Sequence, residues 1–291
     1  MGEKALRPLN SDPVVSTGPE GVVKGNPDEF YGQAIVAFLD LLGFNSAIHS
    51  RWPDGPTSAV RAFLNVRESL PSAGKQVEWG IFSKPDESDL VTYRCRFQGF
   101  ADSLVISVAV PGGINIGEFS IASAGVFTNV REAWKACICG GFTIRGAIEV
   151  GPIFWNLTDI VGPALSNAIT IEKRDSSSSR VLVGPAFVRG LVKASRSWGA
   201  QGEWLSPRQL LMIDGDGLVC LSPKSLIGPA GKDPLGILQR LDQLRGECPL
   251  EAKAKYDGLL RALKNPQQVR TPTVDDLEAY AKSWPVGAPE C

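Results

Sequence analysis

The sequence predicts an α+β protein with a mixed or antiparallel sheet, and three observations support this fold class. Strand-like and helix-like segments alternate irregularly along residues 33–222. Two strand pairs are expected to form hairpins, at 90–110 and 209–221, and successive hairpins argue against a doubly wound parallel sheet. After Ser222 the apolar spacing is purely helical, which predicts a helical C-terminal extension.

Each element follows from local pattern. Residues 1–30 are rich in Pro, Gly, Ser and charge, which is typical of a mobile arm. Strands are indicated by runs of β-branched and aromatic residues, and helices by apolar residues three or four positions apart. We therefore expect a buried strand at 33–44, a helix at 57–70, and two strands within 90–110 that fold about 99–103. A helix at 116–136, ended by Gly140 and Gly141, a strand at 142–155 and a helix from about 161 to 174 follow. The remaining elements are a short strand within 176–185, a short helix at 185–195, a hairpin at 209–221 that turns at Asp214 and Gly215, and helices at 235–246, 249–265 and 274–284.

The amino-acid composition limits the kinds of functional site that this chain can form. The chain has 291 residues, with 30 Lys and Arg against 31 Asp and Glu, so we expect no general coating of nucleic acid. Its single histidine, His49, excludes sites that need two, such as His-rich zinc centres, and we interpret it as a surface or helix-face residue. A metal site in this protein would have to use carboxylates, which favours magnesium or manganese.

The sequence also predicts a location. Six cysteines show no framework spacing, which is typical of reduced thiols in a cytoplasmic protein. The N-terminal residues lack the apolar core of a signal peptide, and no apolar run is long enough to span a membrane. We therefore expect a soluble, cytoplasmic protein.

An acid inside an apolar strand is the most informative feature. Asp40 lies within FLDLLGF, and a buried carboxylate without a partner would cost several kcal/mol. Its partner can be an arginine, a group of backbone N–H donors or a metal ion. A glycine turn at Gly43 followed by a helix start would add an anion site at the same strand end. A helix N-cap or a buried salt bridge is the alternative explanation of Asp40.

A second acid strengthens the metal interpretation. Asp102 lies at the expected turn between the two strands of 90–110. Two acids at neighbouring strand ends can hold two divalent cations, the arrangement that serves phosphoryl and nucleotidyl transfer. Because aspartate is also a common turn former, Asp102 alone would predict little. The metal site is predicted by the two acids together.

Four segments, in order, resemble elements of the class III nucleotidyl cyclases, the family of adenylate and guanylate cyclase catalytic domains. FLDLLGF at 38–44 is similar to the F-x-D-x-x-G-F element, and FQGFADSLVISV at 97–108 to the strand, turn and strand that carry the second aspartate. FTIRGAIEVGPIF at 142–154 resembles the R-x-G-x-x-x-G-P strand, and TDIVGPALSNA at 158–168 the D-x-x-G-x-x-x-N helix start. The stand-alone organisation is most similar to the bacterial pyrimidine cyclases of Pycsar antiphage defence.

The resemblance implies a ferredoxin-like (βαββαβ) palm and a set of site residues. Asp40 and Asp102 would bind two Mn²⁺ or Mg²⁺ ions, helped by the Leu41 carbonyl. Gln98 would contact the base, and Asp159 would supply a second base contact across a head-to-tail homodimer with sites at its interface. The backbone N–H groups that would hold the triphosphate belong to Leu42, Gly43 and Phe44.

The helix motif departs from the family pattern. The family continues N-x-x-x-R, and strict spacing puts Ser166 and Thr170 at those positions. Asn167 lies one residue later, and the nearest cations are Lys173 and Arg174. If a local shift in the helix lets these residues serve, the resemblance implies that Asn167 orients the ribose and that Lys173 or Arg174 meets the charge that develops in the transition state. In the alternative, the transition state relies more on metal.

The base position also departs from the purine patterns. Alternate side chains of a strand share a face, so Arg94, Arg96 and Gln98 point the same way. An Arg fork beside an amide that both donates and accepts matches the edge of uracil, which favours Arg96 and Gln98 as its readers. In the alternative interpretation these arginines are solvated or paired with nearby acids.

We therefore expect a cyclase that converts a pyrimidine nucleoside triphosphate to its cyclic monophosphate and pyrophosphate, as a second messenger for a separate antiphage effector. The expected preference is UTP, then CTP, then ATP. The alternatives are an adenylate cyclase and a catalytically inactive, nucleotide-binding dimer. The expected organisation is an arm at 1–30, a catalytic domain at 31–225 and a helical extension at 226–291.

Overall fold

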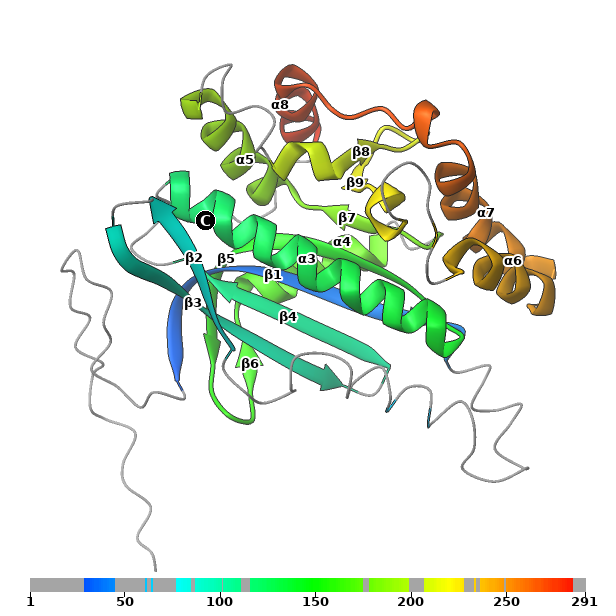
Figure 1. The fold of residues 1–291 in the computed structure, drawn as a ribbon, viewed down its shortest axis with the longest axis horizontal. Helices are drawn as coiled ribbons and strands as arrows, with labels where there is room; N and C mark the ends of the chain where they lie inside the picture. Colours follow the sequence, from blue (N-terminus) through cyan, green and yellow to red (C-terminus); the bar gives the residue numbers. More distant parts are fainter. Residues whose placement is uncertain are drawn as a thin grey trace, which may run out of the picture.

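The protein has an α+β fold with a mixed sheet (Figure 1). The computed structural model describes residues 29–44, 61, 64, 77–84, 87–100, 102–110, 116–174, 178–198, 207–227, 233, 236–248 and 250–284. The strands are β1 (Phe30–Leu42), β2 (Val77–Lys84), β3 (Glu87–Phe100), β4 (Ser103–Ala109), β5 (Thr143–Trp155), β6 (Ile160–Val161), β7 (Val181–Val183), β8 (Leu211–Ile213) and β9 (Val219–Leu221).

Six α-helices are described, and short 3-10 turns flank the small strands. The helices are α3 (Ile116–Gly140), α4 (Pro163–Arg174), α5 (Pro185–Trp198), α6 (Ile237–Glu247), α7 (Leu250–Lys264) and α8 (Val274–Ser283), and the 3-10 turns are η3 (Pro207–Leu210), η4 (Pro223–Leu226) and η6 (Pro266–Gln268).

The sheet has the strand order β2-β3-β4-β1-β5-β7-β9-β8, and β6 pairs with β5. β1 is central and antiparallel to both neighbours, β4 and β5. β7 runs parallel to β5, which makes the sheet mixed. The β3–β4 and β8–β9 hairpins confirm the two that the sequence predicts.

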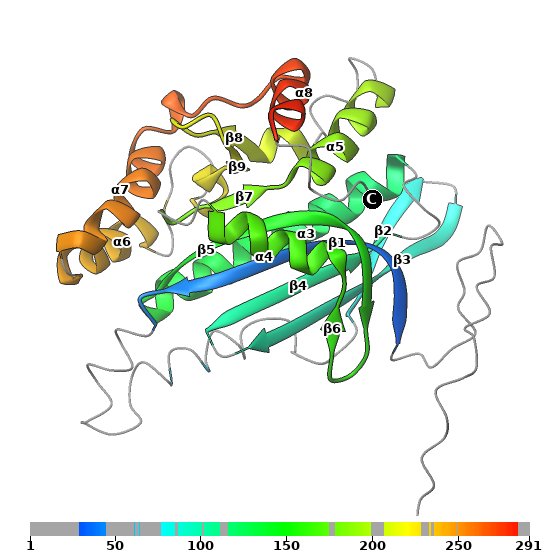
Figure 2. The same ribbon diagram turned by 180° about the vertical axis from the view of Figure 1, so that it is seen from behind.

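Both faces of β1 are buried, which explains its nearly continuous apolar sequence. Ile35, Leu39 and Leu41 contribute to the large core under α3. Ala34 and Val36 belong to the smaller core on the opposite face, which includes Ala164 of α4. Figures 1 and 2 show α3 and α4 on these two sides of the sheet.

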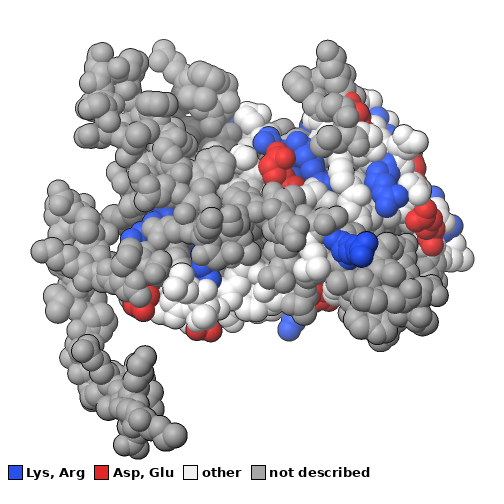
Figure 3. Space-filling view, turned by 60° about the horizontal axis from the view of Figure 1, so that its bottom comes forward, with Lys and Arg blue, Asp and Glu red and all other residues white. Residues whose placement is uncertain are grey.

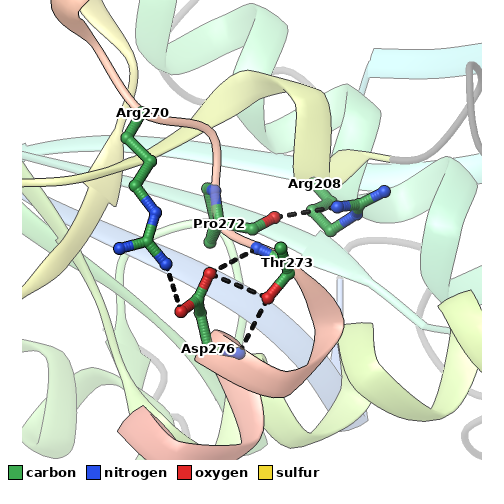
Figure 4. Close-up of polar contacts among 5 residues, drawn as sticks. All are labelled: Arg208, Arg270, Pro272, Thr273 and Asp276. Carbon is green, nitrogen blue, oxygen red and sulfur yellow. Dashed lines mark hydrogen bonds and ion pairs between the residues drawn. The ribbon is translucent and has the colours of Figure 1, made fainter.

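The C-terminal helices share the large core, to which Ile237, Leu259 and Leu277 contribute. Helix α8 is anchored at both ends. The Tyr280 hydroxyl donates a 2.8 Å hydrogen bond to the Val183 carbonyl. At its start Thr273 and Asp276 form a capping box, beside the 2.9 Å bond from Arg208 to the Pro272 carbonyl (Figure 4).

Most expected elements are confirmed with shifted ends. Helix α3 extends to Gly140, and the expected helix at about 161–174 begins at Pro163. Strand β2 was not predicted. The expected helix at 57–70 lies outside the described residues, except for positions 61 and 64, which are helical.

Two further findings concern the surface. Within the described residues, no helix combines the length and apolar character needed to cross a bilayer. On the face drawn in Figure 3, the described Lys and Arg residues are interspersed with Asp and Glu, as the net charge of −1 suggests.

Candidate functional site

The two aspartates that the sequence selects lie at the same end of the sheet. Asp40 is opposite Ser103 of β4, and Asp102 occupies the preceding turn, between β3 and β4. The Leu41 N–H donates a 2.9 Å hydrogen bond to the Asp102 carbonyl, which fixes the turn against β1. Antiparallel pairing therefore brings together two acids that are far apart in the sequence.

The Asp40 carboxylate is largely buried, with its side chain 17% exposed. Burial raises the pKa of Asp40 above its usual value, and the nearby Asp102 charge raises it further, while Arg145 and Lys255 act in the opposite direction. A cation beside Asp40 and Asp102 would relieve the repulsion between their carboxylates.

Arg145 is the residue that contacts Asp40 most directly. Register places it opposite Asp40 on β5, and its Nε lies 2.7 Å from Asp40 Oδ2. The same Nε lies 2.8 Å from Oε1 of Glu172, on the last turn of α4. Burial raises the pKa of Glu172, and Arg145 opposes that effect. The buried salt bridge that was the alternative explanation of Asp40 is therefore present.

Sequence reasoning gave Arg145, Glu172 and Lys255 no role. Arg145 is the arginine of the segment that resembles R-x-G-x-x-x-G-P, so the signal was present in the sequence. Its contact with Asp40 becomes visible only with the β1–β5 register. Glu172 and Lys255 come from helices α4 and α7, and no motif marks them.

The end of β1 has the expected strand–glycine–helix form as far as it is described. Strand β1 ends at Leu42, Gly43 has a left-handed φ of 90°, and Phe44 is helical. The side chains of Leu41, Leu42 and Phe44 are buried, and the Phe44 ring lies 5.9 Å from that of Phe142. Residues 45–50 lie outside the described residues, so the triphosphate assignment to Leu42, Gly43 and Phe44 stays a prediction.

The expected base readers lie on β3 and contact the chain's own loop 156–159. Arg96 is 5% exposed, and its Nη2 donates to the Leu157 carbonyl. Gln98 Nε2 donates to the Thr158 carbonyl. Asp159, expected from a partner subunit, follows Thr158 and so lies near Gln98 within one chain. The roles of these residues in base recognition stay predictions.

Loop 156–159 has its own internal support. The Asn156 side-chain oxygen accepts from the N–H groups of Thr158, at 2.8 Å, and Asp159, at 2.7 Å. Asp159 Oδ2 accepts a 2.7 Å hydrogen bond from the Thr158 hydroxyl. The loop is therefore a preformed turn that presents its carbonyls to β3.

The helix-borne residues lie on α4. Asn167 is half-buried, and Lys173 is exposed next to Glu172, whose pKa it lowers. The Arg174 guanidinium lies 4.9 Å from the centre of the Trp284 ring, a cation–π contact. The catalytic roles of Asn167, Lys173 and Arg174 stay predictions.

The donor set at this sheet end suits a cation that arrives with its substrate. Among the described residues, no three His, Cys, Asp or Glu side chains gather to hold a metal ion by themselves. Asp40 and Asp102 form a pair, and magnesium is commonly held by one or two carboxylates together with substrate phosphates and water. The pair therefore fits a divalent ion whose remaining ligands come from a bound molecule or from water.

Comparison of the chain with protein-family models, with curated proteins and with solved structures finds no match.

Proposed function

We propose that this protein is a nucleotidyl cyclase that acts on a pyrimidine nucleoside triphosphate, with UTP favoured over CTP. The observation that carries the proposal is the pair of acids, Asp40 at the end of the central strand and Asp102 in the adjoining turn, linked by the 2.9 Å bond from Leu41 to Asp102. Carboxylates on neighbouring strand ends suit nucleotidyl transfer with two divalent ions.

The strand order supports a ferredoxin-like palm. Strands β3, β4, β1 and β5 lie side by side with every neighbouring pair antiparallel, and α3 connects β4 to β5. This is the arrangement expected of a βαββαβ unit. The first helix of such a unit would correspond to 57–70, of which only positions 61 and 64 are described. The aspartates lie at one end of the central strand of this unit.

The proposed reaction is intramolecular. The ribose 3′-oxygen bonds to the α-phosphorus, its proton is lost, and the bond to pyrophosphate breaks. Bound Mn²⁺ or Mg²⁺ would lower the pKa of the hydroxyl and neutralise the triphosphate. Asp40 and Asp102 would hold the ions, and Arg145 holds the Asp40 carboxylate in place through its 2.7 Å contact.

Arg96 and Gln98 would read the pyrimidine. Both side chains already donate to carbonyl oxygens, those of Leu157 and Thr158, and uracil also presents carbonyl acceptors to such donors. In the proposed reaction the base replaces the loop carbonyls, and Asp159 of a second protomer completes the site in a head-to-tail dimer. The cyclic product would then act on a separate effector.

One alternative is nucleotide binding without turnover. Arg145 already contacts Asp40 Oδ2, which competes with metal binding. The positions of the family's Asn and Arg hold Ser166 and Thr170, and the Thr170 hydroxyl donates a 2.9 Å hydrogen bond to the Ser166 carbonyl.

The test is incubation of the purified full chain with each of the four ribonucleoside triphosphates and Mn²⁺ or Mg²⁺, with products identified by mass. We expect cyclic UMP and pyrophosphate as the main products. Cyclic AMP as the main product would replace the substrate assignment with that of an adenylate cyclase. Nucleotide binding with no cyclic product would favour the inactive dimer.

A further inference from the structure

A groove separate from the Asp40 site lies between helices α5 and α8. Its volume is about 610 Å³, within the range of small-molecule sites. Figures 1 and 2 show α5 and α8 side by side, away from the carboxyl end of β1. No step of the proposed reaction uses this groove.

Cationic side chains surround the groove, whose lining is mostly apolar. Helix α5 contributes Arg189, Lys193 and Arg196, which are spaced four and three residues apart and so share one face. Helix α8 contributes Lys282 and one acid, Glu278. Among the described lining residues, four cations thus face a single carboxylate, in a chain whose overall net charge is −1.

The one acid is already paired. Glu278 forms an ion pair with Arg196 across the groove. Arg189, Lys193 and Lys282 are exposed, and no described carboxylate forms an ion pair with them. These three cations therefore lie around the groove without an ion pair to a described carboxylate, and an anionic ligand would supply that contact.

Most of the lining surface is apolar. Val192 and Ala281 lie between the charged residues, and both pack against the large core. Long Lys and Arg stems add further apolar surface while their charged ends reach water. The walls are held in place because Tyr280 bonds to Val183 and the capping box fixes the start of α8 (Figure 4).

We propose that this groove binds a small organic anion with an apolar body. Its acidic group would lie among Arg189, Lys193 and Lys282, and its apolar part would cover Val192 and Ala281. The volume favours a small molecule over a folded partner. This site is independent of the proposed cyclase reaction.

The first test uses anilinonaphthalene sulfonate, an anion with an aromatic body, titrated into the full chain and followed by fluorescence. We expect saturable binding that weakens at high salt. The double variant Lys193→Glu and Lys282→Glu should weaken it by about tenfold or more, because attraction becomes repulsion at two positions. The matched control is Lys264→Glu, an exposed lysine on α7 paired with Asp242. Equal binding by the double variant and the wild type would overturn the proposal.

The second test separates the charge from the apolar contact. Dodecanoate should displace the probe, and acetate at the same concentration should not. Ala281→Phe, which fills the apolar lining but keeps every charge, should also abolish binding, with circular dichroism as the check that the variant folds. If polyglutamate displaces the probe and dodecanoate does not, the groove receives an acidic protein segment and the small-molecule proposal is wrong.

Discussion

Arg145 lies between two carboxylates at the end of the sheet that carries the candidate metal site. Its Nε is 2.7 Å from Asp40 and 2.8 Å from Glu172, whose side chain is only 5% exposed. A cation so placed favours the ionised form of both carboxyl groups and so opposes the effect of burial, which raises their pKa. Arg145 therefore stabilises the fold and favours the ionised form of Asp40, the form that the proposed metal site requires.

Replacement of Arg145 should be costly for this reason. We expect Arg145→Met to lower the free energy of unfolding by about 3 kcal/mol, since it leaves two carboxylates without their cation. Adding Glu172→Gln should restore part of the loss, because one of the uncompensated charges is removed. Urea unfolding at neutral pH measures both effects. The control is Arg131→Met, whose partner Glu132 is about half exposed, and an equal loss in the two variants would contradict the account.

Glu149 is a second buried acid, and it connects β5 to helix α5. It is 2% exposed and accepts hydrogen bonds from the N–H groups of Val150, at 2.9 Å, and Phe187, at 2.7 Å, with a longer one from Ala186. Burial raises its pKa from 4.5 to about 7, although these bonds and the charge of Arg189 favour the ionised form. The folded protein therefore binds this proton more tightly than the unfolded chain does.

This difference predicts the direction of a pH effect on stability. Between pH 4.5 and about 7, unfolding releases the Glu149 proton. The contribution of Glu149 to the free energy of unfolding therefore falls as the pH rises through this range, and it is constant at higher pH. The raised pKa of Glu149 corresponds to a fall of about 3 kcal/mol in the free energy of unfolding across this pH range. Glu149→Gln should remove that slope from a plot of unfolding free energy against pH. The same slope in the variant and the wild type would show that Glu149 does not titrate as described.

At the scale of elements, loop 156–159 controls access to the proposed base readers. Its carbonyls accept from Arg96 and Gln98, and Asn156 holds its turn through N–H groups of Thr158 and Asp159. A nucleotide that uses the same donors must displace the loop. Its apparent affinity is therefore the intrinsic affinity multiplied by the fraction of molecules in which the loop has left Arg96 and Gln98.

Loosening the loop should therefore favour substrate. We expect Asn156→Ala to lower the KM for UTP by about tenfold with little change in kcat, because the turn loses its internal hydrogen bonds. Steady-state kinetics with Mn²⁺ measure both constants. The control is Asn265→Ala, a half-buried asparagine directly after α7 whose side chain donates to the Arg261 carbonyl. A KM that is unchanged or raised would mean that the loop does not compete with the base.

Local sequence patterns predicted most of the helices and strands, but they could not predict contacts between residues that are far apart in the sequence. The two-sided apolar run of β1 and the helical spacing of α6, α7 and α8 depend on neighbours within one element. Strand β2 was missed because charged residues and a glycine interrupt its eight positions. The Arg145–Asp40 contact joins residues 105 positions apart, and the Gln98–Thr158 contact joins residues 60 apart. Single-sequence periodicity carries no information about such pairs.

At the scale of the whole molecule, the sheet joins two regions with different chemistry. One contains Asp40 and Asp102, where we propose turnover of a nucleotide, and the other is the cationic groove between α5 and α8. The large core runs without a break from the sheet into the C-terminal helices, so the helices after Ser222 contribute to the same folded unit as the sheet. Asp40 and Asp102 were predicted from sequence, whereas the groove depends on how two distant helices pack.

The most direct test of the account compares UTP turnover by the wild type with that by Asp40→Asn and Asp102→Asn, with Mn²⁺ and cyclic UMP measured by mass. Each variant removes one carboxylate charge with little change in shape, and the control is Asp242→Asn, an exposed residue paired with Lys264. We predict a loss of at least about a hundredfold for each site variant and none for the control. Wild-type rates of cyclic UMP formation in either site variant would contradict the assignment of Asp40 and Asp102 as the metal ligands.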